Sequence, residues 1–345
     1  MVTAAFHPVP PNHGTPPRLG HFAVPPLTQQ PATDYRAIID LARRAELEGF
    51  DSFWVAEGRI ATNGLPSALT FLAALSQQTQ TLTLGTAVIT LAFEDPISLA
   101  ETAAVVDALS EGRLQLGLGK SNRGGWATPA FEALSLHERD RDALFTASLV
   151  RFRAALGGES EGREFTIHPP ASHLRGRLWQ ATGSISTAAA AGVAGDGLQL
   201  HRKSPEGDTG EVQSRLIDAY LERLPDEADP RIGASRVVLP ARDRADAVAL
   251  YREQISARPD HYRRVDRAAD LEQHLVESNV AYGSVADIAG ILARDAAARR
   301  ATDLLFSIPL PFDVPEYGDG LATVAHRLAP LLATRERLTA RPVHA

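Results

Sequence analysis

The chain has 345 residues, of which 44% are apolar and 22% charged, with a net charge of −7 and no cysteine. This length suits one large α/β barrel or two ordinary domains, and the absence of cysteine excludes disulfides, thiolate catalysis and cysteine-ligated metals. The scattered charges predict no nucleic-acid partner, and no apolar run approaches the roughly 20 residues of a membrane span. We therefore expect a cytoplasmic protein without a membrane partner.

Residues 1–17 are rich in proline and predict an extended N-terminal arm. Residues 18–335 show neither an internal repeat nor a linker, which predicts a single domain. Residues 336–345 are expected to form a C-terminal tail.

Short apolar runs alternate with amphipathic stretches along the whole domain. The apolar runs predict strands at 18–24, 51–57, 82–91, 113–119, 177–182, 196–202, 231–240 and 302–311. Helices are expected at 33–50, 66–79, 95–112, 138–156 and 319–333, an alanine-rich helix after Thr187, an extended piece at 163–170 and polar helices over 241–300.

Strands that each lead into a helical stretch predict a parallel sheet of the α/β class. Their number favours a single (β/α)8 TIM barrel, with an insertion after strand 4 and extra helices between strands 7 and 8. Asp95 before Pro96 predicts a helix N-cap.

In such a barrel, functional side chains lie where the strands end. Those ends carry Glu57, residues 86–88, Lys120, residues 182–187, His201 with Arg202, and residues 307–309. Trp126 follows the fourth strand and is expected either to line a substrate pocket or to anchor its loop.

The stretch from Thr182 to Thr187 places several hydroxyls and one glycine where a strand leads into a helix. Serine and threonine there can cap the helix by accepting from the free N–H groups of its first turn. The same N–H groups, the helix dipole and Lys120 from the neighbouring strand can instead hold a phosphate. Both interpretations stay open from the residues alone.

The run GLGKSNRGG at 117–125 matches a dinucleotide fingerprint only in part, because Asn122 stands where the third glycine belongs. We therefore predict no nicotinamide site in this chain.

Three longer runs resemble the bacterial-luciferase-like flavin monooxygenases in their order and spacing. They are LARRAELEGFDSFWVAE, LTLGTAVITLAFEDPISLAETAAVVDALSEGRLQLGLGK and LWQATGSISTAAAAGVAGDGLQLHR. The resemblance covers most of residues 18–332 and implies a (β/α)8 barrel that binds reduced FMN or, in some branches, the deazaflavin F420.

The resemblance also implies which residues meet the cofactor. The phosphate ligands would be Gly183, Ser184, Ser186 and Thr187, with Lys120 as the cation and Arg123 as its rival. A non-proline cis peptide bond beneath the flavin ring would join Ala87 and Val88.

One motif departs from the family pattern. The second strand of the luciferases proper ends in Glu-His-His, whereas this chain has Glu57, Gly58 and Arg59. Glu57, His201 and Arg202 are candidates for the missing catalytic role. Glu57 could equally be the structural partner of an arginine, and His201 could be an ordinary loop residue. We predict no metal site.

The leading hypothesis is an FMN-dependent two-component monooxygenase that oxygenates a small organic substrate with reduced flavin and O2. A separate NAD(P)H:flavin reductase would supply the flavin. Helices at 66–79 and 96–110 are apolar beyond one face, which together with the resemblance suggests a homodimer. The alternatives are an F420-dependent hydride-transfer oxidoreductase and a non-catalytic flavin-binding protein.

Overall fold

The computed structural model describes residues 16–25, 30–61, 63–121, 127–137, 139–160, 162–205, 207–257, 270–312 and 314–333. Its barrel strands are β1 (Arg18–Ala23), β2 (Ser52–Val55), β3 (Thr83–Thr86), β4 (Ile89–Thr90), β5 (Leu114–Gly119), β8 (Leu178–Ala181), β9 (Gly197–Leu200), β10 (Ile232–Pro240) and β12 (Asp303–Ser307).

These strands close into a parallel barrel. Counting β3 and β4 as one interrupted strand, the described residues supply eight strands in the order β1, β2, β3, β5, β8, β9, β10 and β12. Pairing of β12 with β1 completes the circle. The predicted (β/α)8 fold is confirmed.

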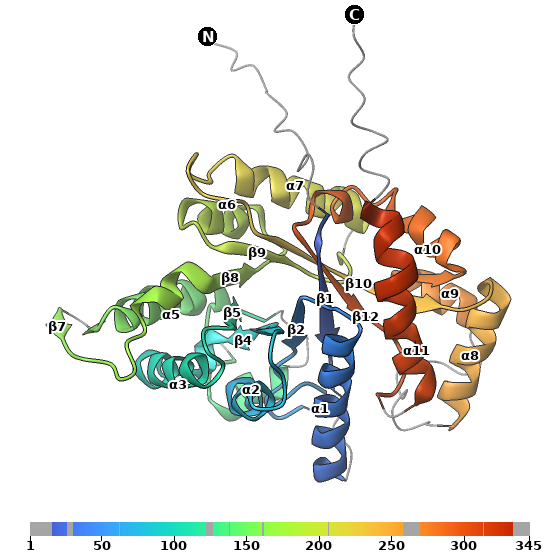
Figure 1. Cartoon of the computed structure of the whole chain (residues 1–345). Coiled ribbons are helices and arrows are strands. Elements are labelled where there is room, and N and C mark those ends of the chain that lie inside the picture. The colour runs from blue at the N-terminus through green and yellow to red at the C-terminus, as the bar shows by residue number, and fades with distance from the viewer. Residues whose placement is uncertain are drawn as a thin grey trace, which may run out of the picture.

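Helices surround the barrel (Figure 1). They are α1 (Pro31–Leu47), α2 (Ala68–Ser76), α3 (Pro96–Leu109), α5 (Arg141–Leu156), α6 (Ile185–Val193), α7 (Thr209–Leu221), α8 (Arg244–Ala257), α10 (Val285–Leu292) and α11 (Pro315–Thr323). In Figure 1, α2, α3 and α5 lie on the left and α8, α10 and α11 on the right. None of the described helices is both long enough and apolar enough to cross a bilayer.

The additions to the barrel lie largely where the sequence predicts them. After β5 come the short helix α4 (Thr128–Ala133) and a hairpin of β6 (Glu159–Ser160) and β7 (Arg163–Glu164). The extended piece expected at 163–170 therefore contributes only two residues to a strand.

The expectation of helices throughout 241–300 is wrong in one place. Between α9 (Leu271–Glu277) and α10 the chain forms a strand, β11 (Val280–Gly283), which pairs with the second half of β10 outside the closed barrel. The four-residue run is fully buried and too short to show a strand periodicity against its polar helical neighbours.

Two other boundaries differ from the prediction. The third strand, expected to be continuous over 82–91, breaks after Thr86 and resumes at Ile89. The last helix begins at Pro315 rather than at residue 319, because proline fits the first helical turn. A π-helical segment, Val324–Leu328, continues it.

Aspartates cap the N-termini of several helices. Asp95 accepts hydrogen bonds from the backbone N–H groups of Ile97 (3.1 Å) and Ser98 (2.9 Å), which confirms the predicted N-cap of α3. Asp140 and Asp208 cap α5 and α7 in the same way. These caps stabilise the first turns of their helices.

Tryptophans and glycines fill the lower part of the barrel. Trp54 and Trp179 meet edge to face with ring centroids 5.3 Å apart, and Leu305 packs against them. A Cβ at Gly85 would lie 2.1 Å from a ring carbon of Trp54, and one at Gly197 would lie 2.3 Å from Trp179. The glycines therefore make room for the two indoles, which close the barrel beneath its carboxyl-end mouth.

Behind the barrel wall, His21 of β1 is fully buried between Phe50, Phe53 and Tyr317. Its Nε2 lies 3.2 Å from the Tyr317 hydroxyl, while Nδ1 has no hydrogen-bond partner among the described residues. Burial lowers the pKa of His21 to about 3. The ring is therefore neutral in the folded protein at physiological pH.

This buried histidine is expected to make unfolding easier in mild acid. Between pH 6.5 and about 3 the unfolded chain binds a proton that the native state does not, so stability falls as the pH falls. The loss between pH 6.5 and 5 should be about 2 kcal/mol. Urea unfolding at several pH values measures it, and His21→Gln should flatten the dependence by one proton. Equal slopes for both proteins would contradict the prediction.

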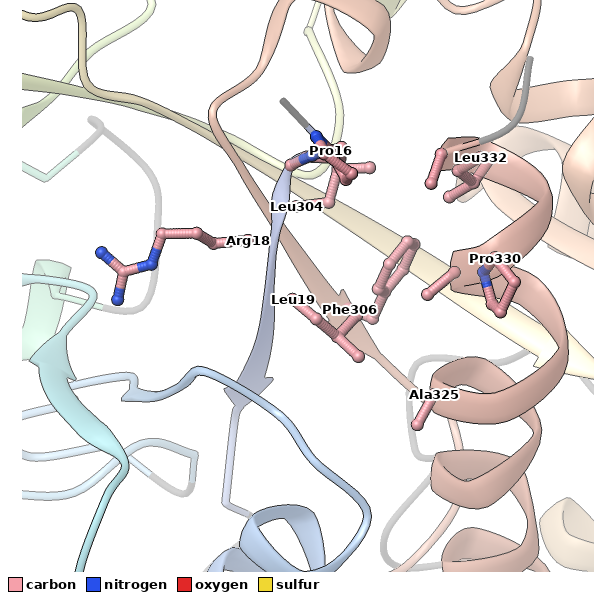
Figure 2. A pocket seen from close by; sticks show the side chains of 11 residues that line it. Pro16, Arg18, Leu19, Leu304, Phe306, Ala325, Pro330 and Leu332 are labelled. Atoms are coloured by element: carbon pink, nitrogen blue, oxygen red, sulfur yellow. The ribbon is translucent and has the colours of Figure 1, made fainter. Parts of the chain in front are cut away.

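A cavity of about 210 Å³ lies behind the wall rather than in the mouth (Figure 2). Apolar side chains of β1, β12 and the last helical segment line it, among them Leu19, Leu304, Phe306 and Leu332. Leu304 and Phe306 flank Leu305, which faces the barrel interior. The cavity is a packing gap between the wall and the last helix, and we assign it no function.

Candidate functional site

The mouth of the barrel, at the carboxyl ends of the strands, is the place where the predicted site residues meet. The indoles of Trp54 and Trp179 fill the interior below it. Loops and helix N-termini that follow β2, β4, β5, β8 and β9 surround the mouth.

The hydroxyl cluster after β8 does not cap its helix. Ser184 occupies the N-cap position of α6, yet among the described residues its side chain accepts no hydrogen bond from the first turn. Its Oγ lies 2.8 Å from the Oγ of Ser186 instead, and Thr182 Oγ1 accepts from the Ser184 N–H at 2.9 Å. The N-terminal N–H groups of α6 are thus left for another acceptor.

The space around this turn is open. Gly183 and Ser186 are exposed, and Ser184 and Thr187 are partly exposed. In the described structure, a Cβ built on Gly183 would meet no atom within 4 Å. Helix N-termini with free N–H groups, hydroxyls and room attract anions. Of the two interpretations of this stretch, the geometry favours the anion site.

The predicted cation already has a carboxylate partner. Lys120, directly after β5, pairs with Asp142 in the first turn of α5. Its side chain is 18% exposed, against 68% for that of Asp142. Asp142 is thus the more exposed member of the ion pair. To bind an anion at α6, Lys120 would have to leave Asp142.

The break in the third strand contains the predicted cis peptide bond. The bond between Ala87 and Val88 is cis, as the family resemblance implies. Gly119 on the neighbouring β5 accommodates this segment, because a Cβ there would lie 2.5 Å from Cγ2 of Val88.

Glu57 belongs to a cluster of charges beside the mouth. Its carboxylate lies 3.7 Å from Nε of Arg59, and Arg59 also pairs with Glu94. Burial raises the pKa of Glu57 to about 7, although Arg59 and the backbone N–H groups of Ala68 and Thr90 oppose that rise. Burial likewise raises the pKa of Glu94. Glu57 is therefore the partner of an arginine, which is one of the two roles expected from the sequence. With a pKa of about 7, its carboxyl group changes protonation state near neutral pH.

His201 and Arg202 follow β9 at the mouth. His201 keeps an exposed surface, while the surrounding protein desolvates the ring and, together with the charge of Arg202, lowers its pKa. A side chain that is exposed to solvent and yet desolvated by the surrounding protein lies in a concave surface, which here is the mouth of the barrel. Desolvation also lowers the pKa of Arg202, which makes no ion pair with any described carboxylate.

Gln199 lies on β9 two residues before His201, so alternation puts it on the inward face with Gly197. It is 4% exposed, and neither Oε1 nor Nε2 has a hydrogen-bond partner among the described residues. The sequence analysis missed this residue, because the period-two pattern of GLQLHR indicates its inward face but not the lack of a partner for its amide.

Two predicted residues cannot be placed. Trp126 and Arg123 lie outside the described residues.

A comparison with protein families decides the affiliation of this barrel. Residues 18–302 match the model of the luciferase-like monooxygenases. The chain belongs to the luciferase-like monooxygenase family.

The curated relatives of this chain include a dehydrogenase and a monooxygenase. A protein of Intrasporangium calvum named F420-dependent glucose-6-phosphate dehydrogenase is 31% identical over 181 residues, 47% of this chain and 53% of that protein. The 4-hydroxyprotoasukamycin monooxygenase of Streptomyces nodosus subsp. asukaensis is 27% identical over 250 residues, 66% of each chain. The matched regions thus span about half to two thirds of these curated relatives.

A solved monooxygenase structure shares the whole fold. The oxygenating constituent of 3,6-diketocamphane monooxygenase from Pseudomonas putida, solved in complex with FMN, superposes with a TM-score of 0.72 at 16% identity. The superposition covers 92% of this chain and 99% of that one. At such identity the likeness establishes the barrel fold alone.

Proposed function

We propose that this luciferase-like protein is an FMN-dependent monooxygenase of the two-component kind, acting with O2 on a small organic substrate. A separate NAD(P)H:flavin reductase would supply reduced FMN. The proposal includes a homodimer, which the exposed apolar side chains of Val105 and Leu109 on α3, each 45% exposed, support.

The uncapped N-terminus of α6 carries the proposal. Its free N–H groups, the exposed hydroxyls of Ser184 and Ser186 and the open space at Gly183 fit a dianionic phosphate such as that of FMN. Thr187 adds a third hydroxyl in the same turn, and Lys120 supplies a positive charge from the neighbouring strand.

When bound, reduced FMN would supply the electrons that activate O2. The chain itself would bind and orient the reactants. Ala87 and Val88 would lie under the ring, and the Trp54–Trp179 layer would exclude water from below. His201, kept neutral by its lowered pKa, is able to accept a proton at the mouth, and Arg202 is able to bind an anionic group.

F420 is the second candidate cofactor, because a relative at 31% identity is named as F420-dependent. In that case the same barrel would transfer a hydride and O2 would play no part. Both cofactors carry phosphate, so the α6 site alone does not separate them.

Anaerobic calorimetric titration with reduced FMN and with reduced F420, followed by admission of O2, separates the candidates. Tight FMN binding with oxygen uptake above the free-flavin rate supports the monooxygenase. Binding of F420 with no oxygen uptake supports hydride transfer. FMN binding without added oxygen uptake supports a non-catalytic flavin-binding protein, and binding of neither cofactor contradicts the proposal.

Removing the α6 hydroxyls is expected to weaken FMN binding. The double variant Ser184→Ala/Ser186→Ala loses two hydrogen bonds to a charged acceptor, which should raise the Kd for FMN about 10- to 100-fold. The Kd for riboflavin, which lacks the phosphate, should stay unchanged. Calorimetry measures both ligands.

Two controls accompany this prediction. Ser67, the residue before α2, also leaves its helix uncapped and bonds Thr70 at 2.7 Å, so Ser67→Ala should leave FMN binding unchanged. Lys120→Ala should weaken FMN binding, whereas Asp142→Asn, which releases Lys120, should not weaken it. Equal FMN affinity in the wild type and the double variant would overturn the phosphate assignment.

A further inference from the structure

The carboxamide of Gln199 is a buried polar group without a partner. The side chain is 4% exposed, and both its donor and its acceptor lack a hydrogen bond within the described structure. Leaving a buried polar atom unpaired costs about 1–3 kcal/mol. An amide held in this way is suited to a ligand that pairs with both atoms.

The residues beside Gln199 on the two adjoining strands carry no polar side chain. Ala181 and Gly233 are its register neighbours on β8 and β10. On β5, a Cβ at Gly117 would lie 1.9 Å from the carbonyl oxygen of Thr86 and 2.8 Å from the Gln199 oxygen, so glycine at this position leaves room for both. The nearest buried indole, that of Trp179, already donates to Gln115 Oε1 at 2.8 Å.

Gln199 lies between the Trp54–Trp179 layer and the N-terminus of α6, where we place the phosphate. Gly197, two residues earlier, packs against Trp179, and His201, two residues later, lies at the mouth. Ala181, beside Gln199, begins the short segment that leads to Ser184. One elongated ligand with a phosphate at α6 would therefore reach Gln199 with its other end.

A primary amide presents a donor and an acceptor side by side, and rotation of the amide by 180° exchanges them. Its complement is a planar ring edge with an N–H next to a carbonyl. The pyrimidinedione edge of a flavin or a deazaflavin has this arrangement. We propose that Gln199 binds this edge of the cofactor ring, donating from Nε2 to a ring carbonyl and accepting the ring N–H at Oε1.

The inference rests on the proposed function, since it needs a flavin or deazaflavin in the mouth. It assigns the ring end of that cofactor to a residue on β9, independently of the phosphate end on α6. A substrate with an amide or imide edge is the other source of the same chemistry.

The test is anaerobic calorimetry with riboflavin, FMN and F420 in the absence of any substrate. Gln199→Met keeps the length of the side chain and removes both hydrogen bonds. It should raise the Kd of riboflavin and of the cofactor that the wild type binds by the same factor, about tenfold. Gln199→Glu, which keeps the shape but loses the donor when ionised, should also weaken both ligands.

A stability measurement separates this role from a structural one. Because Gln199→Met removes an unpaired buried amide, the ligand-free variant should be as stable in urea as the wild type, or more stable. Gln115→Met is the matched control inside the same barrel: it breaks the hydrogen bond from Trp179, so it should lower stability and leave the affinities unchanged.

Unchanged riboflavin and cofactor affinities in Gln199→Met would overturn the inference and would leave the proposed function standing. This outcome includes the case in which the amide serves the substrate. If the wild-type protein binds neither FMN nor F420, the proposed function fails and the inference fails with it.

Discussion

Replacing Asp295 by alanine is expected to lower the free energy of unfolding by about 3–5 kcal/mol. Asp295 accepts two hydrogen bonds from Arg236, at 2.6 and 3.0 Å, and the Arg236 side chain is only 3% exposed. The variant would leave this guanidinium buried without its carboxylate. It would also remove the acceptor of the Ala297 and Ala298 N–H groups, at 3.1 and 2.9 Å. Urea unfolding measures the change.

An exposed ion pair of the same residue types is the control. Arg242 and Asp246 pair at 2.9 Å, with side chains 82% and 39% exposed. Asp246→Ala should therefore change stability by less than about 1 kcal/mol, since water screens such pairs. A similar loss in both variants would show that burial does not determine the effect.

The second large effect is expected in the barrel floor. Trp179→Ala removes an indole that packs on Trp54 and donates to Gln115, and the resulting cavity should destabilise the protein by about 3–5 kcal/mol. Gly197→Ala should also destabilise it, because the new methyl group would lie 2.3 Å from the Trp179 ring. Thermal or urea unfolding measures both variants.

The double variant provides the decisive comparison. In Trp179→Ala, the ring that excludes a side chain at Gly197 is gone, so adding Gly197→Ala should cost little or nothing. The two losses should therefore be strongly non-additive. Additive losses would mean that Gly197 is required for its own backbone rather than for the indole.

Much of this fold could be predicted from alternating apolar and amphipathic runs, because each barrel strand is buried on both faces. The exceptions have local causes. The four residues of β11 are too few to show a period, and its pairing with β10 is a tertiary contact. The interruption after Thr86 carries no signal in a run as rich in β-branched residues as any intact strand.

The candidate site could be predicted only in part. Strand ends located Glu57, Lys120, His201 and the α6 hydroxyls, since a parallel barrel gathers those ends. The contacts of these residues could not be predicted. Nothing in the sequence pairs Lys120 with Asp142. The sequence also does not reveal whether a serine at the N-cap position, such as Ser184, accepts a capping hydrogen bond. Gln199 was missed because an unpaired amide is recognised only when its neighbours are known.

The contact between Trp54 and Trp179 also gives the barrel a fluorescent probe of its own. Of the three tryptophans in the sequence, Trp54 and Trp179 lie in contact beneath the mouth. Indole emission overlaps flavin absorption, so a flavin in the mouth would take up the excitation energy of both rings and dim their ultraviolet fluorescence. The intrinsic tryptophan fluorescence of the unlabelled protein should therefore report the binding of a flavin in the mouth.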